Sequence, residues 1–201
     1  MSWAAANGHE GIAEVLLGRN DVNPDGADNR LRTPLSFAAE KGRGKIVRIL
    51  LERNDVNPDT ADEGGRTPLS WAATLEWGKR GTEKGHEGIV KMLLERNDVN
   101  PNTADRYGLT PLIWAARKGG ENIVRMLLEQ NVVNPDTVGE DGQTALSRAA
   151  KEGDEEVMRM LLQRDGVDPD RADRSGRTPL SFAAEAWHWS KDFGGGGMRG
   201  L

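Results

Sequence analysis

The chain has 201 residues, of which 36% are apolar, and a net charge of −5 at neutral pH. The acidic balance argues against a sequence-independent hold on nucleic acid or on an anionic membrane, since such binding needs a basic face. The absence of cysteine excludes disulfides, thiol nucleophiles and cysteine-ligated metals. No apolar run approaches the roughly 20 residues of a membrane span, and the N-terminus lacks a signal pattern. We therefore expect an intracellular, cytoplasmic protein.

A short motif recurs through the chain and is clearest as Arg-Thr-Pro-Leu-Ser-Trp-Ala-Ala at residues 66–73. Its threonine recurs at spacings of 34, 43, 34 and 34 residues, at Thr33, Thr67, Thr110, Thr144 and Thr178. The longer spacing contains a nine-residue insertion at 74–82, and residues 1–5 match the motif without its Thr-Pro, which makes six registers. A fixed period of this size predicts a solenoid in which each repeat covers the apolar face of its neighbour.

Each complete repeat predicts two short helices. Thr33 followed by Pro34 is typical of a helix N-cap with proline at the first helical position, and this first helix is expected to close near Gly42. The second helix carries apolar residues at a period close to 3.6, namely Ile46, Val47, Ile49, Leu50 and Leu51. Five segments of the chain have this second pattern.

The segments between repeats carry turn signals. Each second helix is followed by a residue that tolerates the left-handed conformation of a helix end, at Asn20, Asn54, Asn97, Asn131 and Asp165. A proline then favours an extended connection. Glycine stands two residues before most of the motif threonines, as the tip of a tight turn requires. Leu31 replaces it once, which predicts a strained or differently shaped turn.

The turn glycine, Thr-Pro-Leu, paired alanines, Gly-His, Ile-Val and Leu-Leu together resemble the ankyrin-repeat signature, and the best match is residues 65–94. The resemblance implies an all-α repeat solenoid, an ankyrin-type stack of helix-turn-helix units with projecting β-turn or hairpin loops, over residues 1–186. Residues 187–201 are expected to form an aromatic, then Gly-rich, flexible tail. Serine or isoleucine follows Thr-Pro-Leu where the family usually has histidine, which puts the family's Thr–His hydrogen bonds in question. The amino-acid sequence of the repeats resembles that of arrays common in filamentous fungi.

No catalytic or metal site is predicted. His9 and His86 lie in Gly-His-Glu-Gly, where the ankyrin family places a structural histidine, and no His-x-x-x-His spacing is present. The carboxylates recur once per repeat and are not gathered at one point. We therefore expect a protein that is not an enzyme and that needs no cofactor or metal.

Three surfaces are candidates for binding a partner. Trp77 in the insertion either tucks against the stack or anchors an interface. A stripe of one residue per repeat either packs between first helices or forms the floor of a concave groove, and it comprises Trp3, Phe37, Trp71, Trp114, Arg148 and Phe182. The turn tips vary on a constant frame, which suits recognition, although solvation alone also explains them. The candidate partner-binding residues are Arg30, Glu63, Trp77, Arg106, Tyr107, Trp114, Glu140, Asp141, Arg148 and Arg174.

We predict a non-catalytic protein–protein interaction module that binds another protein through its concave groove and turn tips, and that binds neither nucleic acid nor a membrane. The alternative is a structural or sensor arm of a larger multidomain protein, such as a fungal NTPase with an ankyrin array, because the first and last repeats are incomplete. A cap formed by Trp187, Trp189 and Phe193 is the other explanation of the last repeat. We expect a monomer, with end-to-end association as a further option.

Overall fold

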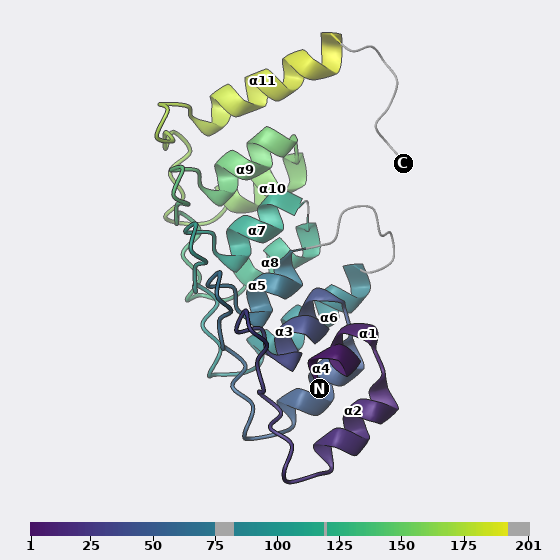
Figure 1. The fold of residues 1–201 in the computed structure, drawn as a ribbon. Helices are drawn as coiled ribbons and strands as arrows, with labels where there is room; N and C mark the ends of the chain where they lie inside the picture. The colour runs from purple at the N-terminus through teal and green to yellow at the C-terminus, as the bar shows by residue number, and fades with distance from the viewer. Residues whose placement is uncertain (75–82, 119, 193–201) are drawn as a thin grey trace.

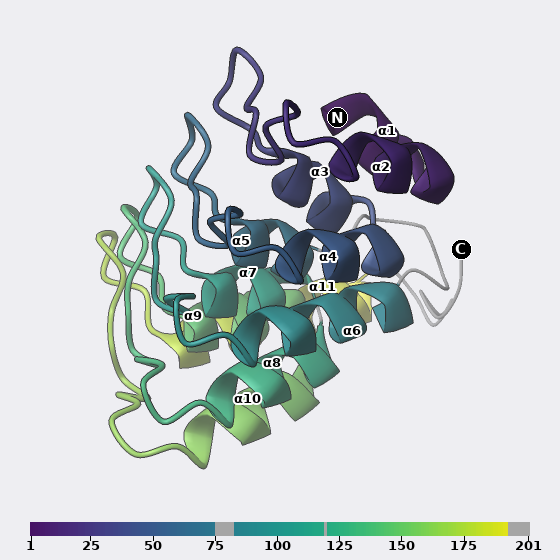
Figure 2. The ribbon, with the colours of Figure 1, turned by 90° about the horizontal axis from the view of Figure 1, so that it is seen from below.

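The structure is a computed structural model that describes residues 1–74, 83–118 and 120–192, without the side chains of residues 83, 84 and 186–192. Figure 1 shows the described helices stacked in chain order, from α1 at one end to α11 at the other. Figure 2 shows two layers of helices and a row of loops that project to one side. The described residues form helices and no strand, and the predicted all-α repeat solenoid is confirmed.

Each repeat supplies one helix to each layer. The first helices are α1 (Ser2–Asn7), α3 (Pro34–Glu40), α5 (Pro68–Ala73), α7 (Pro111–Lys118), α9 (Ala145–Glu152) and α11 (Pro179–Asp192). The second helices are α2 (Glu10–Leu17), α4 (Gly44–Leu51), α6 (Glu83–Leu94), α8 (Glu121–Leu128) and α10 (Glu155–Leu162). Within each layer, every helix packs on the equivalent helix of the next repeat, so the stack is held by nearest-neighbour contacts.

The predicted threonine caps are confirmed at the five first helices from α3 to α11, and three of these caps explain the serine of the motif. At α3 the Thr33 hydroxyl accepts a hydrogen bond from the Ser36 backbone N–H at 3.2 Å, and the two hydroxyl oxygens lie 3.1 Å apart. Both residues are fully buried. Thr67 with Ser70 and Thr144 with Ser147 repeat this arrangement. The serine therefore satisfies the buried cap of its own repeat, in the place where the family usually has histidine.

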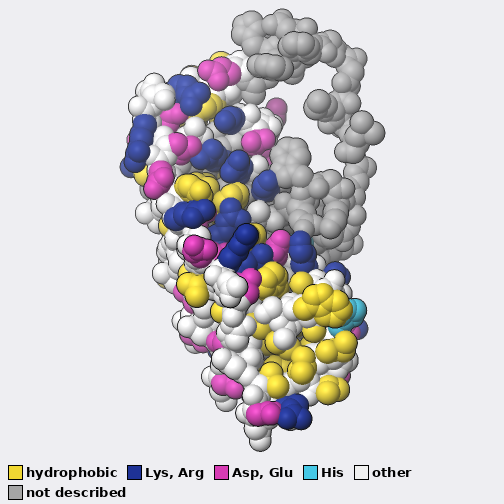
Figure 3. Space-filling view, viewed as in Figure 1, with side chains coloured by type: hydrophobic (Ala, Val, Ile, Leu, Met, Phe, Trp, Pro, Cys, Tyr) yellow, Lys and Arg dark blue, Asp and Glu magenta, His cyan; other side chains and the backbone are white. Residues whose placement is uncertain are grey.

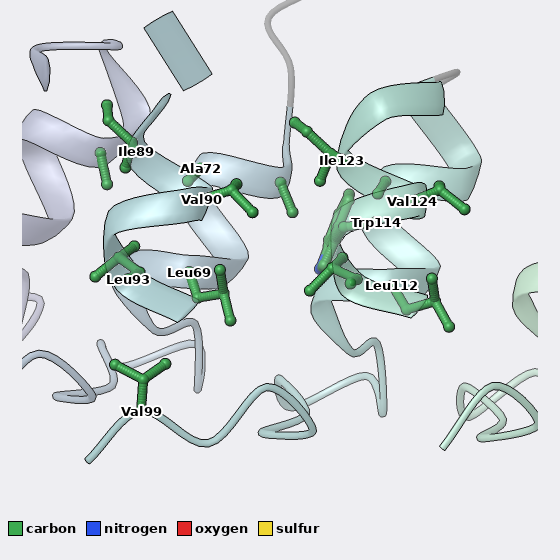
Figure 4. Close-up of a cluster of buried hydrophobic side chains, with 14 of the residues drawn as sticks. Leu69, Ala72, Ile89, Val90, Leu93, Val99, Leu112, Trp114, Ile123 and Val124 are labelled. Carbon is green, nitrogen blue, oxygen red and sulfur yellow. The ribbon is translucent and has the colours of Figure 1, made fainter. Parts of the chain in front are cut away.

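The core is a thin layer between the two rows of helices. Small side chains let the first helices approach closely, and Ala72 is fully buried. Figure 4 shows Leu69 and Ala72 of α5 beside Ile89, Val90 and Leu93 of α6. These residues have no exposed surface, which is why a chain with few large apolar residues still forms a continuous core.

Four of the five β-turns before the first helices from α3 to α11 are built alike, around an aspartate. In the turn before α5, the Gly65 N–H donates to the Asp62 carbonyl at 2.8 Å. The Oδ1 atom of Asp62 accepts from the N–H groups of Gly64 and Arg66 at 2.8 and 2.9 Å. Gly65 has a φ of 79°, which confirms the reason for a glycine there.

Each turn is also joined to the next by one backbone hydrogen bond. The Glu63 N–H donates to the Arg30 carbonyl at 2.9 Å, and the Arg106 N–H donates to the Gly64 carbonyl at 2.8 Å. The remaining bonds of this series are donated by the N–H groups of Glu140 and Arg174. The turn tips therefore form a continuous row with fixed spacing.

The turn before α3 has Leu31 in place of glycine. Its φ of 59° is the one positive value that a non-glycine residue takes among the described residues, so the predicted strain is confirmed. The alternative of a different shape is wrong. The Leu31 N–H still donates to the Asp28 carbonyl at 2.9 Å, and Asp28 Oδ1 still accepts from the N–H groups of Arg30 and Arg32.

The ends of the second helices correct another prediction. None of the Asn or Asp residues expected to be left-handed has a positive φ. At α4 the helix closes instead through Glu52, with a right-handed φ of −71°, and the Arg53 N–H donates to the Leu50 carbonyl at 3.2 Å. A tightened right-handed last turn satisfies the terminal carbonyls without a left-handed residue.

Helix α11, the first helix of the last repeat, packs on α9. It extends to Asp192, beyond residue 186, after which the tail was expected to begin. The side chains of Trp187 and Trp189, and all of Phe193, lie outside the described residues.

Candidate partner-binding face

The first helices and the β-turns together form one face of the stack, here called the groove face. Three aromatic residues of the predicted stripe lie on it in a row that is connected by arginine side chains. The Arg32 guanidinium lies 4.0 Å from the Phe37 ring centre and 4.3 Å from that of Trp71. Arg66 lies 4.6 Å from the Trp71 ring and 4.1 Å from that of Trp114. Rings and guanidinium groups thus alternate across α3, α5 and α7, and we call these five residues the aromatic–arginine stack. Each contact is a cation–π interaction between neighbouring repeats or within one.

Aspartates of the β-turns anchor this stack. The Trp71 indole N–H donates to Asp62 Oδ2 at 3.0 Å, and the Trp114 indole N–H donates to Asp105 Oδ2 at the same distance. Since the other oxygen of each aspartate holds its turn, one side chain fixes both the tip and the stack. Arg66 Nε lies 3.6 Å from Asp105 Oδ2 in the next repeat, which adds a link between repeats.

The stripe changes character at both ends. Trp3 on α1 is 68% exposed, whereas Phe182 on α11 is buried beneath Arg177, 4.5 Å from its ring centre. At α9 the stripe residue is Arg148, whose Nη2 pairs with Asp141 Oδ2 at 2.6 Å. The stripe is therefore neither a plain packing seam nor an open apolar floor, the two interpretations that the sequence left open.

Arg148 is accompanied by a second change, because Gly139 stands where the other turns have their anchoring aspartate. A Cβ at Gly139 would lie 2.8 Å from Leu109 Cδ2, so the leucine of the preceding turn fills this space. Asp141 then takes over the bonding, since its side chain accepts both the Gln143 N–H and the Arg148 guanidinium.

A pocket of about 390 Å³ opens where three β-turns meet the aromatic–arginine stack. We call it the groove pocket, and it is lined by Arg30, Arg32, Asp62, Glu63, Gly64, Arg66, Trp71, Asp105, Arg106 and Tyr107. Figure 3 shows Lys and Arg side chains gathered over the middle of this face. Burial, followed by the charge of the neighbouring Arg117, lowers the pKa of Lys118 on α7. The middle of the groove face is thus locally basic in an acidic protein.

A family model for ankyrin repeats matches the chain in three copies, at residues 1–81, 80–138 and 131–190. The chain belongs to the ankyrin-repeat family. A search of curated protein sequences found no match. Ankyrin repeats are in general non-catalytic protein–protein interaction modules. Among the described parts of this ankyrin-repeat protein, no helix is long and apolar enough to cross a membrane.

The ankyrin turns bring four of the sequence-predicted residues together, because Arg30, Glu63, Arg106 and Tyr107 all line the groove pocket. Glu140, Asp141 and Arg174 lie on the next two tips and are exposed. Trp114 is only 6% exposed and supports Arg66 from within the stack, so it offers a partner little surface. Trp77 lies outside the described residues.

Sequence reasoning missed Arg32 and Arg66. The available signal was an arginine directly before the motif threonine, with an aromatic residue five positions later, at 32 and 37 and again at 66 and 71. Of the two histidines expected to be structural, His86 is buried, whereas His9 is exposed with its ring 4.8 Å from that of Trp3. His86 is buried with Nε2 3.0 Å from the Glu40 carbonyl oxygen, and the described residues include no group of three potential metal ligands.

Proposed function

We propose that this chain is a non-catalytic module that binds a protein partner on its groove face, through the groove pocket and the flanking turn tips. The observation that carries the proposal is the convergence of three β-turns on the aromatic–arginine stack. Arg30, Arg106 and Tyr107 are exposed there on a backbone that hydrogen bonds hold in place. A partner would meet a surface that is already ordered, which lowers the entropic cost of association.

The test compares the chain with two matched double variants in a pull-down from cell lysate, read by quantitative mass spectrometry. Arg106→Glu with Tyr107→Ala changes the groove pocket. Arg125→Glu with Val132→Ala makes equivalent changes at exposed residues of α8 and its following loop. Circular dichroism establishes that both variants fold.

A partner that is captured by the native chain and the α8 variant but lost with the groove variant supports the proposal. Capture that is lost with the α8 variant and unchanged in the groove variant would place binding on the second-helix layer and would refute it.

A further inference from the structure

The groove pocket concentrates positive charge although the whole chain is acidic. Four arginines and three acidic residues line it. Two of these acids are already used within the protein, because Asp62 and Asp105 each accept two turn N–H groups and one indole N–H. Glu63, exposed at its tip, is the remaining lining acid.

The four arginines of the groove pocket have more N–H donors than the neighbouring carboxylates accept. Within the described part of the chain, Arg30 and Arg106 make no ion pair, and both are exposed. Arg66 stands 3.6 Å from Asp105 Oδ2, which is too long for a strong hydrogen bond. Arg32 pairs with Glu40, yet its Nε is buried and has no hydrogen-bond partner.

We propose that the groove pocket binds the carboxylate side chains of an extended, Asp- or Glu-rich segment of a partner protein, an inference that rests on the proposed function. A guanidinium donates through a planar fork that matches a carboxylate. Trp71 and Trp114 both stack on the Arg66 guanidinium, so its N–H groups are held ready for an acceptor. Trp71 and the half-exposed Tyr107 add apolar area for the aliphatic parts of the segment.

The surroundings of the pocket favour an acidic peptide over a nucleic acid strand, although a phosphate also fits a guanidinium. Glu63 stands in the pocket, and Glu140 and Asp141 occupy the next tip. A nucleic acid strand is charged along its whole length and would run past these acids. A short acidic peptide segment needs only the pocket itself.

The experiment selects peptides from a random phage-displayed library on the full chain and measures their affinities by fluorescence anisotropy. We expect enrichment of Asp and Glu among the selected peptides. Arg30→Gln with Arg106→Gln should weaken their binding about ten- to hundredfold, since charge-assisted hydrogen bonds are lost. Glu63→Gln should strengthen it, because a like charge leaves the pocket.

The matched control is Arg48→Gln with Arg125→Gln, equivalent exposed residues of α4 and α8, which should leave the affinity unchanged. Peptides without acidic enrichment that nevertheless need Arg30 and Arg106 would overturn the acidic-segment inference and leave groove binding standing. Peptides whose affinity is unchanged by Arg30→Gln with Arg106→Gln would overturn both the acidic-segment inference and the proposed binding on the groove face. The selection of no peptide at all would do the same. Tighter binding of labelled polyuridine or polythymidine than of the acidic peptides would overturn the inference in favour of a phosphate ligand.

Discussion

We predict that Asp59→Asn stabilises the protein, because an amide can make a hydrogen bond between repeats that the carboxylate cannot. The equivalent residue one repeat later, Asn102, shows the complete arrangement. Its Oδ1 accepts from the Asn134 N–H at 2.9 Å, and its Nδ2 donates to the Val132 carbonyl at 2.7 Å. Asp59 accepts from the Asn100 N–H, but its Oδ1 is buried without a partner.

The expected gain is about 1 kcal/mol at neutral pH, the low end of the range for an unsatisfied buried polar group, because Asp59 is only half-buried. Burial is the largest cause that raises the pKa of Asp59, the charge of Asp98 adds to it, and the hydrogen bonds from Asn100 and Thr103 oppose it. A raised folded-state pKa favours the native protein below the unfolded pKa of about 3.9, and this advantage is lost as pH rises through the folded pKa. The benefit of asparagine should therefore be largest at neutral pH and shrink in acid.

Urea unfolding followed by circular dichroism at pH near 7 and about 3.5 measures this difference. The control is Asp136→Asn, the same substitution in the next repeat but one. Asp136 already uses both oxygens, since Oδ2 pairs with Arg171 Nη1 at 2.7 Å and Oδ1 accepts from the Asp168 N–H at 3.4 Å. The control should lose up to about 1 kcal/mol. A loss of stability for Asp59→Asn at neutral pH, or an equal gain at both pH values, would refute the reasoning.

Three further substitutions test other parts of the fold. Leu31→Gly should stabilise by about 0.5 to 1 kcal/mol in thermal unfolding, since it relieves a positive φ at an exposed turn; a loss would show that the strain is negligible. Ala72→Leu should destabilise by roughly 1 to 3 kcal/mol, because the residue is fully buried between helices, and an unchanged melting curve would contradict that packing. Tyr107→Ala should change the unfolding free energy by less than about 0.5 kcal/mol, as it is 49% exposed, and a larger loss would mean that the ring is packed.

Much of the fold could be predicted from sequence because the same local signals for helix starts and turns recur in successive repeats. Thr67 with Pro68 specifies a helix start, and Gly65 specifies a positive φ, whatever lies around them. The helix ends could not be predicted in the same way. An asparagine permits a left-handed residue but does not require one, and the last turn tightened instead. Leu31 failed as a sign of altered shape because Asp28, five residues before the helix cap Thr33, holds the turn independently.

The candidate site was predicted only in part. The exposed tips could be recognised by their variation around a constant frame, which is how Arg106 and Tyr107 were found. For the arginines of the aromatic–arginine stack, the motif signals only the pairing within one repeat, as of Arg66 with Trp71, and not the second contact, with Trp114 in the next repeat. Such a role depends on the register between repeats, which a single motif does not contain.

The change at Gly139 and Arg148 makes the couplings along the array unequal. The repeats of α3, α5 and α7 are tied by helix packing, by the bonded turns and by the alternating rings and guanidinium groups. The junction between α7 and α9 has the helix packing and the hydrogen-bonded turns, but it lacks the third interaction because Arg148 stands where the next aromatic ring would be. In a linear array, local opening starts at the weaker junctions. Thermal fluctuations should therefore separate the chain into a cooperative block that keeps the groove pocket intact and a C-terminal portion that opens on its own.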